Sequence, residues 1–385
     1  MPAMIYLDYS ATTPVDLRVV DAMKPYFSDT FGNPSSVHRY GQAAEAAIDS
    51  ARETVASILN CRPDEIIFTS CGSESDNLAI RGSAYAMREK TGAQWILASR
   101  AEHPAVTKTL SHLEKYEGFL IEWLDVDEYG MITAEAVSKA ICDNTAVVSV
   151  MYANNEIGTI NPIKEIAEVC KANHILFHTD AVQAAAYLPL DVGSLGVDMM
   201  SLGAHKFYGP KGVGALYVRK GTPLISHLTG GGQEYSLRAG TQNVPYIFGF
   251  AEALRLTNEE RDQRVTHVKL LRDQIIGTVL ETVPDSRLTG HLESRLPHHA
   301  SFAFKGVDGN LLLTLLDAAG FACSSGSACK TGNPEPSEVM HAIGLSREWG
   351  LGSLRVTLGM HTTPADIESF LNQLPQLVQK ARMLK

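Results

Sequence analysis

The sequence has no pair of cysteines at CxxC spacing, although it contains six cysteines. Neither a zinc site nor a disulfide framework is therefore indicated. Isolated cysteines are usually small buried hydrophobic residues, and we expect that role for most of the six. They are scattered along the chain as Cys61, Cys71, Cys142, Cys170, Cys323 and Cys329.

A surplus of basic residues is also missing. The 385 residues include 33 Lys and Arg against 43 Asp and Glu, which gives a formal net charge of −10 at pH 7. This balance argues against nucleic acid or an anionic membrane as a bulk partner. No apolar run reaches the length of a membrane span, and the start "MPAMIYLDYSATTP" lacks a basic stretch followed by an apolar one. We therefore expect a cytoplasmic protein without a signal peptide.

The first two-thirds of the chain alternates apolar, strand-like runs with helical patterns. This order is typical of an α/β fold, with a largely parallel sheet covered by helices on both faces. One helix face is indicated by Ala44, Ile48, Ala51, Val55 and Ile58, at spacings of four, three, four and three. Ligands of such sheets bind at the carboxyl ends of the strands. The expected strands cover residues 65–70, 94–99, 145–153, 174–180, 197–204 and 212–219.

The pattern changes after about residue 245. One long helical pattern runs over residues 248–283, with Val268, Leu271, Ile275 and Val279 on one face. Shorter strands are expected at 299–306 and 353–360, followed by a final helix from about residue 364. The length suits more than one domain. We predict a large α/β domain over 16–248 and a small α+β domain formed by 1–15 and 249–385.

Polar side chains follow several of the predicted strands. The buried run ending at residue 180 finishes with Asp180, and Gln183 comes three residues later. His205 and Lys206 lie between two apolar strands, directly after Gly203. A carboxylate in such a place often only caps the next helix, and a lysine often only lies in a solvated turn. Both alternatives remain open for each residue taken alone.

Three further strand ends carry groups of the same kind. Gly72 and Ser73 lie between a strand and a helix, where free backbone amides and a hydroxyl form an anion site suited to phosphate. The motif is neither a Walker A loop nor a GxGxxG, and it is weak by itself. Two other strands end near His103 and near Asn154 and Asn155.

Together these groups place a phosphate cradle, a carboxylate, a histidine, an asparagine and a lysine at one edge of one sheet. Pyridoxal phosphate requires this combination, because it needs a lysine for the Schiff base and an Asp that keeps the pyridinium nitrogen protonated. The joint pattern is far stronger than any single part. The sequence therefore predicts a pyridoxal phosphate site, and it predicts no metal site.

The stretch "FACSSGSACKTGNPEPS" over residues 321–337 places Cys329 among Ser, Gly, Asn and Pro. It has no apolar periodicity and cannot bury enough surface to offset the entropy of ordering it. We therefore predict that Cys329 lies on a mobile loop. Cys323 follows the apolar "GFA", and we expect it to end a strand with a structural role.

The chain resembles the cysteine desulfurases of the NifS/IscS class, whose motifs it carries in order over nearly its whole length. The resemblance implies the fold-type I architecture of class V aminotransferases, with a mostly parallel seven-stranded type of sheet, and a homodimer. It also implies conversion of L-cysteine to L-alanine, with the sulfur left as a persulfide on an enzyme cysteine. The matching stretches are "YLDYSATTP", "FGNPSS", "AEHPAV", "ANNEIGT", "HTDAVQ", "HKFYGPKGVGALYVR", "GGGQEYSLRAGTQN" and "SSGSAC".

The same resemblance implies roles for residues around the cofactor ring. It implies Lys206 as the Schiff-base lysine and Asp180 as the partner of the ring nitrogen. His103 is implied to stack on the ring and to move protons. Asn155 and Gln183 are implied as contacts of the ring oxygen O3′.

Further residues are implied at the phosphate, the substrate and the sulfur. The phosphate contacts implied are Gly72, Ser73, His205 and, from the neighbouring subunit, Thr241. Arg355 in "SLRVTLG" resembles the arginine that binds the substrate carboxylate, with Asn33 and Asn155 near it. Cys329 aligns with the cysteine that forms the persulfide.

Two departures from the family pattern stand out. Gly203 stands where many relatives carry Ser, so one hydroxyl contact to the phosphate is expected to be missing. The chain also ends at "VQKARMLK", short of the longer tail that some relatives use for their sulfur acceptor. An acceptor protein is expected, either an iron–sulfur cluster scaffold or another sulfur carrier. A selenocysteine lyase or an aminotransferase on the same fold remains the alternative.

Overall fold

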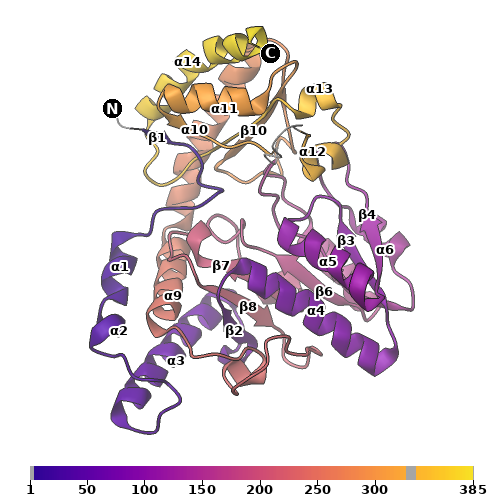
Figure 1. The fold of residues 1–385 in the computed structure, drawn as a ribbon, viewed down its shortest axis with the longest axis vertical. Helices are drawn as coiled ribbons and strands as arrows, with labels where there is room; N and C mark the ends of the chain where they lie inside the picture. Colours follow the sequence, from indigo (N-terminus) through magenta and orange to yellow (C-terminus); the bar gives the residue numbers. More distant parts are fainter. Residues whose placement is uncertain (1–3, 327–334, 385) are drawn as a thin grey trace.

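The computed structural model describes residues 4–326 and 335–384. Within these residues a seven-stranded sheet forms the centre of the larger lobe, in the order β2-β8-β7-β6-β5-β3-β4 (Figure 1). Only β8 runs antiparallel to its neighbours, so the predicted mostly parallel sheet is confirmed. The strands are β2 Ile66–Thr69, β3 Trp95–Ser99, β4 Leu120–Leu124, β5 Thr145–Ser149, β6 Leu176–Asp180, β7 Met199–Gly203 and β8 Gly214–Val218.

Helices cover both faces of this sheet, because its strands are apolar on both faces. Ile66 belongs to one core cluster and Ile67 to the other, as side-chain alternation along a strand requires. Helices α4 and α5 pack on one face, and the remaining large-lobe helices contribute to the other cluster. Their bounds are α3 Arg39–Leu59, α4 Gly72–Thr91, α5 Pro104–Glu117, α6 Ala134–Ala140, α7 Ile163–Ala172, α8 Val192–Leu195 and α9 Val244–Glu259.

Smaller elements complete the large lobe. Two short helices near the start of the chain, α1 Leu17–Met23 and α2 Pro25–Ser28, lie beside α9 (Figure 1). Three turns of 3₁₀-helix are present: η1 Pro63–Glu65, η2 Ala204–Lys206 and η3 Glu234–Ser236. The predicted apolar face of α3 is confirmed, because Ala44, Ile48, Ala51 and Val55 are buried.

The last third of the chain forms a second, smaller lobe, here called the C-terminal lobe, above the large sheet in Figure 1. Its first strand comes from the other end of the chain, because β1 pairs in parallel with β11. Antiparallel strands in the order β12-β10-β9 form its second sheet. Its elements are β1 Ile5–Tyr6, α10 Arg261–Thr282, β9 Ser286–Leu288, β10 His299–Phe304, α11 Gly309–Ala318, β11 Phe321–Ala322, α12 Glu338–Ala342, α13 Arg347–Gly350, β12 Ser353–Thr357 and α14 Pro364–Met383.

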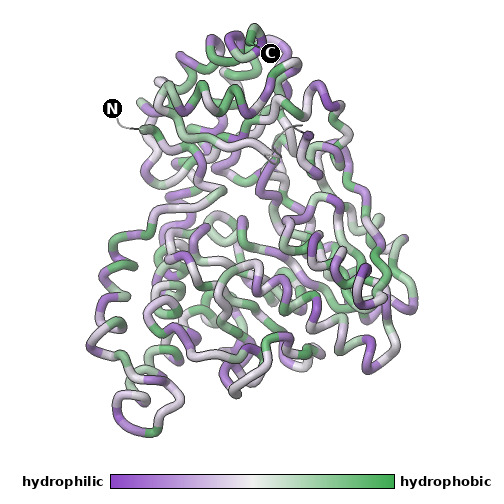
Figure 2. The backbone as a smooth tube through the Cα atoms, viewed as in Figure 1, coloured by the Kyte–Doolittle hydropathy of each residue, from purple (hydrophilic) through white to green (hydrophobic). Residues whose placement is uncertain are grey.

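The arrangement of the C-terminal lobe agrees with an α+β part that takes in the first residues of the chain. Its outer helices show alternating hydrophobic and hydrophilic stretches, as expected for helices with one face on a core (Figure 2). The domain limits given from the sequence remain a prediction. Among the described residues, no helix combines the length and the apolar character needed to cross a bilayer.

Two predictions from the sequence are wrong. The pattern over 248–283 is two helices rather than one, because α9 ends at Glu259 and α10 begins at Arg261. Most cysteines are not buried either: of the five in the described residues, only Cys170 is buried, and Cys142 is exposed. Their positions at helix ends and loops, rather than at core positions of a periodic pattern, account for the difference.

The turn η3 has an unusual backbone. Three consecutive residues without a glycine among them, Glu234, Tyr235 and Ser236, have φ of 47°, 57° and 65°. Such left-handed conformations are unfavourable for side chains other than glycine. Glu234 is buried, and its carboxylate accepts hydrogen bonds from both terminal nitrogens of Arg52 at 2.9 and 2.8 Å and from the Phe68 amide at 2.9 Å. These bonds hold the strained turn against the sheet.

Candidate functional site

A cavity of about 300 Å³ lies between the carboxyl ends of the parallel strands and the C-terminal lobe. It is the place where an α/β sheet is expected to bind its ligand. Nine residues predicted from the sequence line it: Gly72, Ser73, His103, Asn155, Asp180, Gln183, His205, Lys206 and Arg355. The other lining residues are Ser10, Ala11, Cys71, Asp76, Met151 and Val182.

The start of α4 forms one wall of this cavity. Cys71 is the N-cap residue and makes no side-chain capping bond, so the first amides of a 20-residue helix are not capped by its side chain. A Cβ at Gly72 would lie 2.6 Å from Cγ2 of Val182, so a larger residue here would force Val182 to shift. Free amides together with the positive end of the helix dipole favour a phosphate group.

Asp180 and His103 form the polar centre of the site. Asp180 ends β6, is 5% exposed, and accepts a hydrogen bond from the Val182 amide at 2.9 Å. His103 caps α5, and its Nδ1 accepts a hydrogen bond from the Ala105 amide at 3.1 Å. A neutral His103 therefore carries its proton on Nε2. Burial raises the pKa of Asp180, and burial lowers the pKa of His103.

Lys206 follows the end of β7 and is held by the first segment of the chain. Its Nζ donates hydrogen bonds to the carbonyl oxygens of Ser10 at 2.6 Å and Ala11 at 2.8 Å. Burial, assisted by the charge of Arg355, lowers the pKa of Lys206 to about 8. An amine with this pKa is partly neutral near physiological pH, so it can act as a nucleophile and as a base.

His205 also lines the cavity and is held in a neutral form. Burial, followed by the charge of Lys206, lowers the pKa of His205 to about 4. Its Nδ1 lies 3.2 Å from the Thr12 hydroxyl. A neutral imidazole at this place can donate one hydrogen bond to a phosphate oxygen without adding a charge.

Arg355 reaches the cavity from β12. Its guanidinium donates hydrogen bonds to the carbonyl oxygen of Asn155 at 2.9 Å and to the Asp8 carboxylate at 2.9 Å. Its Nε is buried and has no hydrogen-bond partner among the described residues. An unpaired buried donor is costly unless a ligand satisfies it. The arrangement suits a carboxylate ligand.

The two neighbouring asparagines have different positions. Asn154 is buried, and its side chain bonds the Ala101 carbonyl and the amides of Glu156 and Ile157, so it stabilises the loop. Asn155 is partly buried and lines the cavity. Gln183 also lines it and donates from Nε2 to the Ser10 carbonyl at 2.9 Å.

Four predicted residues are not in this lining. Gly203 is buried directly behind the start of α4, since a Cβ built on it would lie 3.4 Å from the Gly72 amide nitrogen. Asn33 and Thr241 are exposed. Cys329 lies outside the described residues.

Several residues of the site were missed by the sequence analysis. Ser10 and Ala11 contribute backbone carbonyls, which residue type does not reveal. Asp8 gives no signal either, because a single acid in "YLDYS" resembles any turn residue. Asp76 lies in the polar-looking helix start "GSESDN", where acids are common at exposed positions. Its burial at 1% exposure could not be foreseen.

The donor set fits pyridoxal phosphate. Its ring nitrogen needs a carboxylate, and Asp180 is a buried one at a strand end. Its phosphate needs amide donors, and α4 begins with them at Gly72, where a larger residue would have to displace Val182. Its aldehyde needs an amine with a lowered pKa, which Lys206 has.

Comparisons with known proteins show the family of the chain. The family model for class-V aminotransferases matches residues 5–370. "Cysteine desulfurase IscS" of Dictyoglomus turgidum is 44% identical over 100% of this chain and 97% of its own, and the protein of the same name from Methanosarcina thermophila is 46% identical over 98% and 93%.

Solved structures are similar over almost the whole chain as well. A "NifS-like protein" is 34% identical with a TM-score of 0.90, covering 98% of this chain and 100% of its own. "SspA in complex with cysteine" is 35% identical with a TM-score of 0.80, covering 93% and 99%. The second structure shows that a related protein binds cysteine.

Proposed function

The chain belongs to the class-V aminotransferase family, and from this premise we propose that it is a cysteine desulfurase that uses pyridoxal phosphate to convert L-cysteine into L-alanine. The full-length similarity to cysteine desulfurases supports this activity. The observation that carries the proposal for the site is the convergence of Lys206, Asp180 and Arg355 on one cavity. These side chains supply an amine, a carboxylate and a carboxylate-binding guanidinium.

The residues that would hold the cofactor follow from their chemistry. Lys206 attaches it through its amine, and Asp180 pairs with the ring nitrogen. Asn155 and Gln183 bind the ring oxygen. The phosphate is bound by the remaining set: Gly72, Ser73 and His205, with Gly203 behind them and Thr241 from a second copy of the chain. When bound, the cofactor supplies an electron sink for the pair left on the substrate Cα.

Five residues take part in substrate binding and proton transfer. Arg355 binds the carboxylate of L-cysteine through donors that include its unpaired Nε, with Asn155 beside it in the cavity lining. The sequence resemblance assigns Asn33 to the substrate as well, although Asn33 lies outside this lining. Lys206 takes the proton from Cα once it is free, because its lowered pKa leaves part of it neutral. His103 is assigned to proton movement on the sequence resemblance, and because its Nδ1 accepts the Ala105 amide, a proton can leave or join the ring only at Nε2.

Sulfur transfer is assigned to Cys329 on the sequence resemblance. Its thiolate attacks the substrate sulfur, so an S–S bond forms and the substrate C–S bond breaks. The electron pair of that bond stays with the carbon fragment, which takes up protons and leaves as L-alanine. Cys329 is left as a persulfide. Cys323 is the less suitable thiol, because its partial burial raises its pKa well above the ordinary value and the thiolate is the nucleophile.

We extend the proposal to the partners and the compartment. The exposure of Thr241, outside the cavity of its own chain, supports a homodimer in which it completes the site of the second copy. The persulfide is then passed to an acceptor protein, for iron–sulfur cluster assembly or another sulfur pathway. We place the enzyme in the cytoplasm, as expected from the sequence.

Product analysis with matched cysteine variants tests this function. Purified protein incubated with L-cysteine and a thiol reductant should release L-alanine and sulfide in equal amounts. Cys329→Ser should keep the bound cofactor but release no sulfide, whereas Cys323→Ser should stay active. Absence of alanine from the wild type, or full activity of Cys329→Ser, would contradict the proposal. L-selenocysteine as a competing substrate tests the alternative lyase activity.

A further inference from the structure

Asp76 is a buried acid in the cavity that the proposed chemistry does not use. It lies on the second turn of α4, is 1% exposed, and lines the same cavity as Lys206. Its Oδ1 has no hydrogen-bond partner among the described residues. Asp76 also makes a side-chain hydrogen bond with Ser201. A buried carboxyl oxygen without any such bond is nevertheless costly and calls for an explanation.

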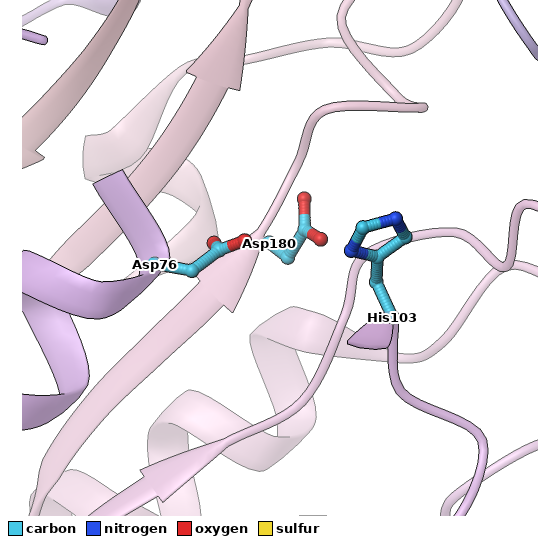
Figure 3. Close-up of side chains that lie close together, drawn as sticks. All are labelled: Asp76, His103 and Asp180. Carbon is cyan, nitrogen blue, oxygen red and sulfur yellow. The ribbon is translucent and has the colours of Figure 1, made fainter. Parts of the chain in front are cut away.

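Asp76 lies close to Asp180 and His103, the two residues assigned to the cofactor ring. One carboxyl oxygen of Asp76, one of Asp180 and one ring nitrogen of His103 all lie within 4.8 Å of one another. In Figure 3, Asp180 lies between the other two side chains. Two ionised carboxylates at this distance in a buried site repel each other strongly. The pair therefore favours one negative charge over two.

Among the described residues, the groups around Asp76 do not supply a positive charge that would balance a second ionised carboxylate. They include acids and neutral side chains. His178 is one of the neutral ones, because burial lowers its pKa to about 3. Burial, followed by the charge of Asp180, raises the pKa of Asp76 well above its ordinary value. The groups that face it are Asp180 and His178 of β6, Ser201 of β7, Glu102 and His103 before α5 and Cys71 before α4, with Lys206 and Arg355 elsewhere in the cavity.

A buried row of hydrogen bonds leads to Asp76 across three strands. The Ser149 hydroxyl lies 2.9 Å from Nδ1 of His178, and Nε2 of His178 lies 2.9 Å from the Ser201 hydroxyl. The same Nε2 is 3.7 Å from Oδ1 of Asp76. Asp180 accepts a hydrogen bond from the Val182 amide at 2.9 Å, whereas Oδ1 of Asp76 accepts none among the described residues, so Asp180 is the better place for the single negative charge.

We propose that Asp76 is a positioning residue that keeps the proton of this pair of buried acids, so that only Asp180 is negatively charged toward the cofactor ring. The inference rests on the proposed function, since it takes Asp180 as the partner of the ring nitrogen. Asp76 itself touches neither substrate nor reacting atoms in this account. It sets the charge of Asp180, the carboxylate that pairs with the ring nitrogen.

Thermal unfolding of the cofactor-loaded protein as a function of pH tests where the proton lies. Unfolded Asp ionises near pH 4, whereas folded Asp76 stays protonated well above that value, so unfolding the wild type releases a proton. Wild-type stability from this group is therefore full at low pH and is lost as the pH rises. Asp76→Asn has no proton to release. Its melting temperature should match the wild type at about pH 4 and exceed it by several degrees at about pH 8.

Asp191→Asn is a matched control, because its effect on stability should change with pH in the opposite direction. Asp191 caps α8, and the Ser194 amide lowers its pKa, so its removal should lower stability increasingly as the pH rises. A difference between Asp76→Asn and wild type that is flat with pH, or that falls as the pH rises, would overturn the inference, because it would place the negative charge on Asp76. If Asp76→Asn does not fold, Asp76→Ser serves the same comparison.

Binding of pyridoxal phosphate separates this inference from the proposed function. Asp180→Asn should bind the cofactor about tenfold or more weakly, because it loses a charge-assisted hydrogen bond. Asp76→Asn should keep an affinity and an absorption spectrum close to those of the wild type. Unchanged binding by Asp180→Asn would contradict the proposed function itself. Equal losses in both variants would leave that function standing and overturn the role given to Asp76.

Discussion

Replacing Gly203 by serine should slow the release of pyridoxal phosphate. Gly203 has φ −139° and ψ 118°, an extended conformation that any residue adopts. A Cβ added there would lie 3.4 Å from the Gly72 amide nitrogen and 3.5 Å from Cγ1 of Val182, which are ordinary contacts. The site therefore has room for a serine at the end of β7, directly behind the start of α4. Its hydroxyl would lie beside the proposed phosphate site.

The size of the effect follows from the bond that would be added. A hydrogen bond to a charged group is worth about 1.5–3 kcal/mol, which corresponds to about 10- to 150-fold slower dissociation. Removing a glycine from a strand should also stabilise the fold by roughly 0.5–1 kcal/mol, independently of the cofactor. Gly203→Ala separates the two contributions, because alanine restricts the backbone without supplying a hydroxyl.

The assay follows transfer of the cofactor from each protein to an excess of an unrelated cofactor-free acceptor enzyme, by absorbance. Gly203→Ala should release the cofactor at the wild-type rate and melt at a slightly higher temperature. Gly203→Ser should melt similarly but release it more slowly. Equal rates for all three proteins would refute the reasoning, and faster release from Gly203→Ser would mean that the new hydroxyl takes the Gly72 amide away from the phosphate.

Two further predictions concern Lys206 and the turn η3. Borohydride reduction and peptide mapping should find the cofactor on Lys206, and label on another lysine would contradict the assignment. The rate at which cofactor-free protein attaches the cofactor should rise with pH and level off above about 8, where the amine of Lys206 is neutral. Glu234→Gln should cost about 3–5 kcal/mol of unfolding free energy, because it leaves the buried Arg52 without its anion. Urea unfolding measures that loss. Glu135→Gln, in an exposed ion pair, is the control and should have no measurable effect. An unfolding midpoint of Glu234→Gln equal to that of the wild type would show that the buried ion pair adds no stability.

Much of the fold could be predicted because buried parallel strands have an unambiguous apolar pattern. All six predicted strands of the large sheet are present, and the ends of β6 and β7 lead to Asp180 and Lys206 as expected. The strand β4 was missed because it lies at the edge of the sheet and mixes exposed and partly buried residues, including the acidic Glu122. Its pattern resembles that of a surface segment.

The site was predictable where side chains carry the chemistry and not where backbone or burial does. Lys206 and Asp180 are identified by residue type at strand ends, but the carbonyl oxygens that hold Lys206 are independent of residue type. Asp76 was missed for a different reason. Its helical position is ordinary for an acid, and only the packing of α4 against the sheet makes it a buried one.

The pairing of β1 with β11 has a consequence for how the protein is made. Ile5 is opposite Phe321, so 321 − 5 = 316 residues of chain separate them. At typical synthesis rates the ribosome needs about 15–60 s to add that length. During this interval the segment that later supplies the Ser10 and Ala11 carbonyls to Lys206 has no strand to pair with. The active site is therefore expected to be completed late in translation or after it, and contacts of such long range slow this last step of folding.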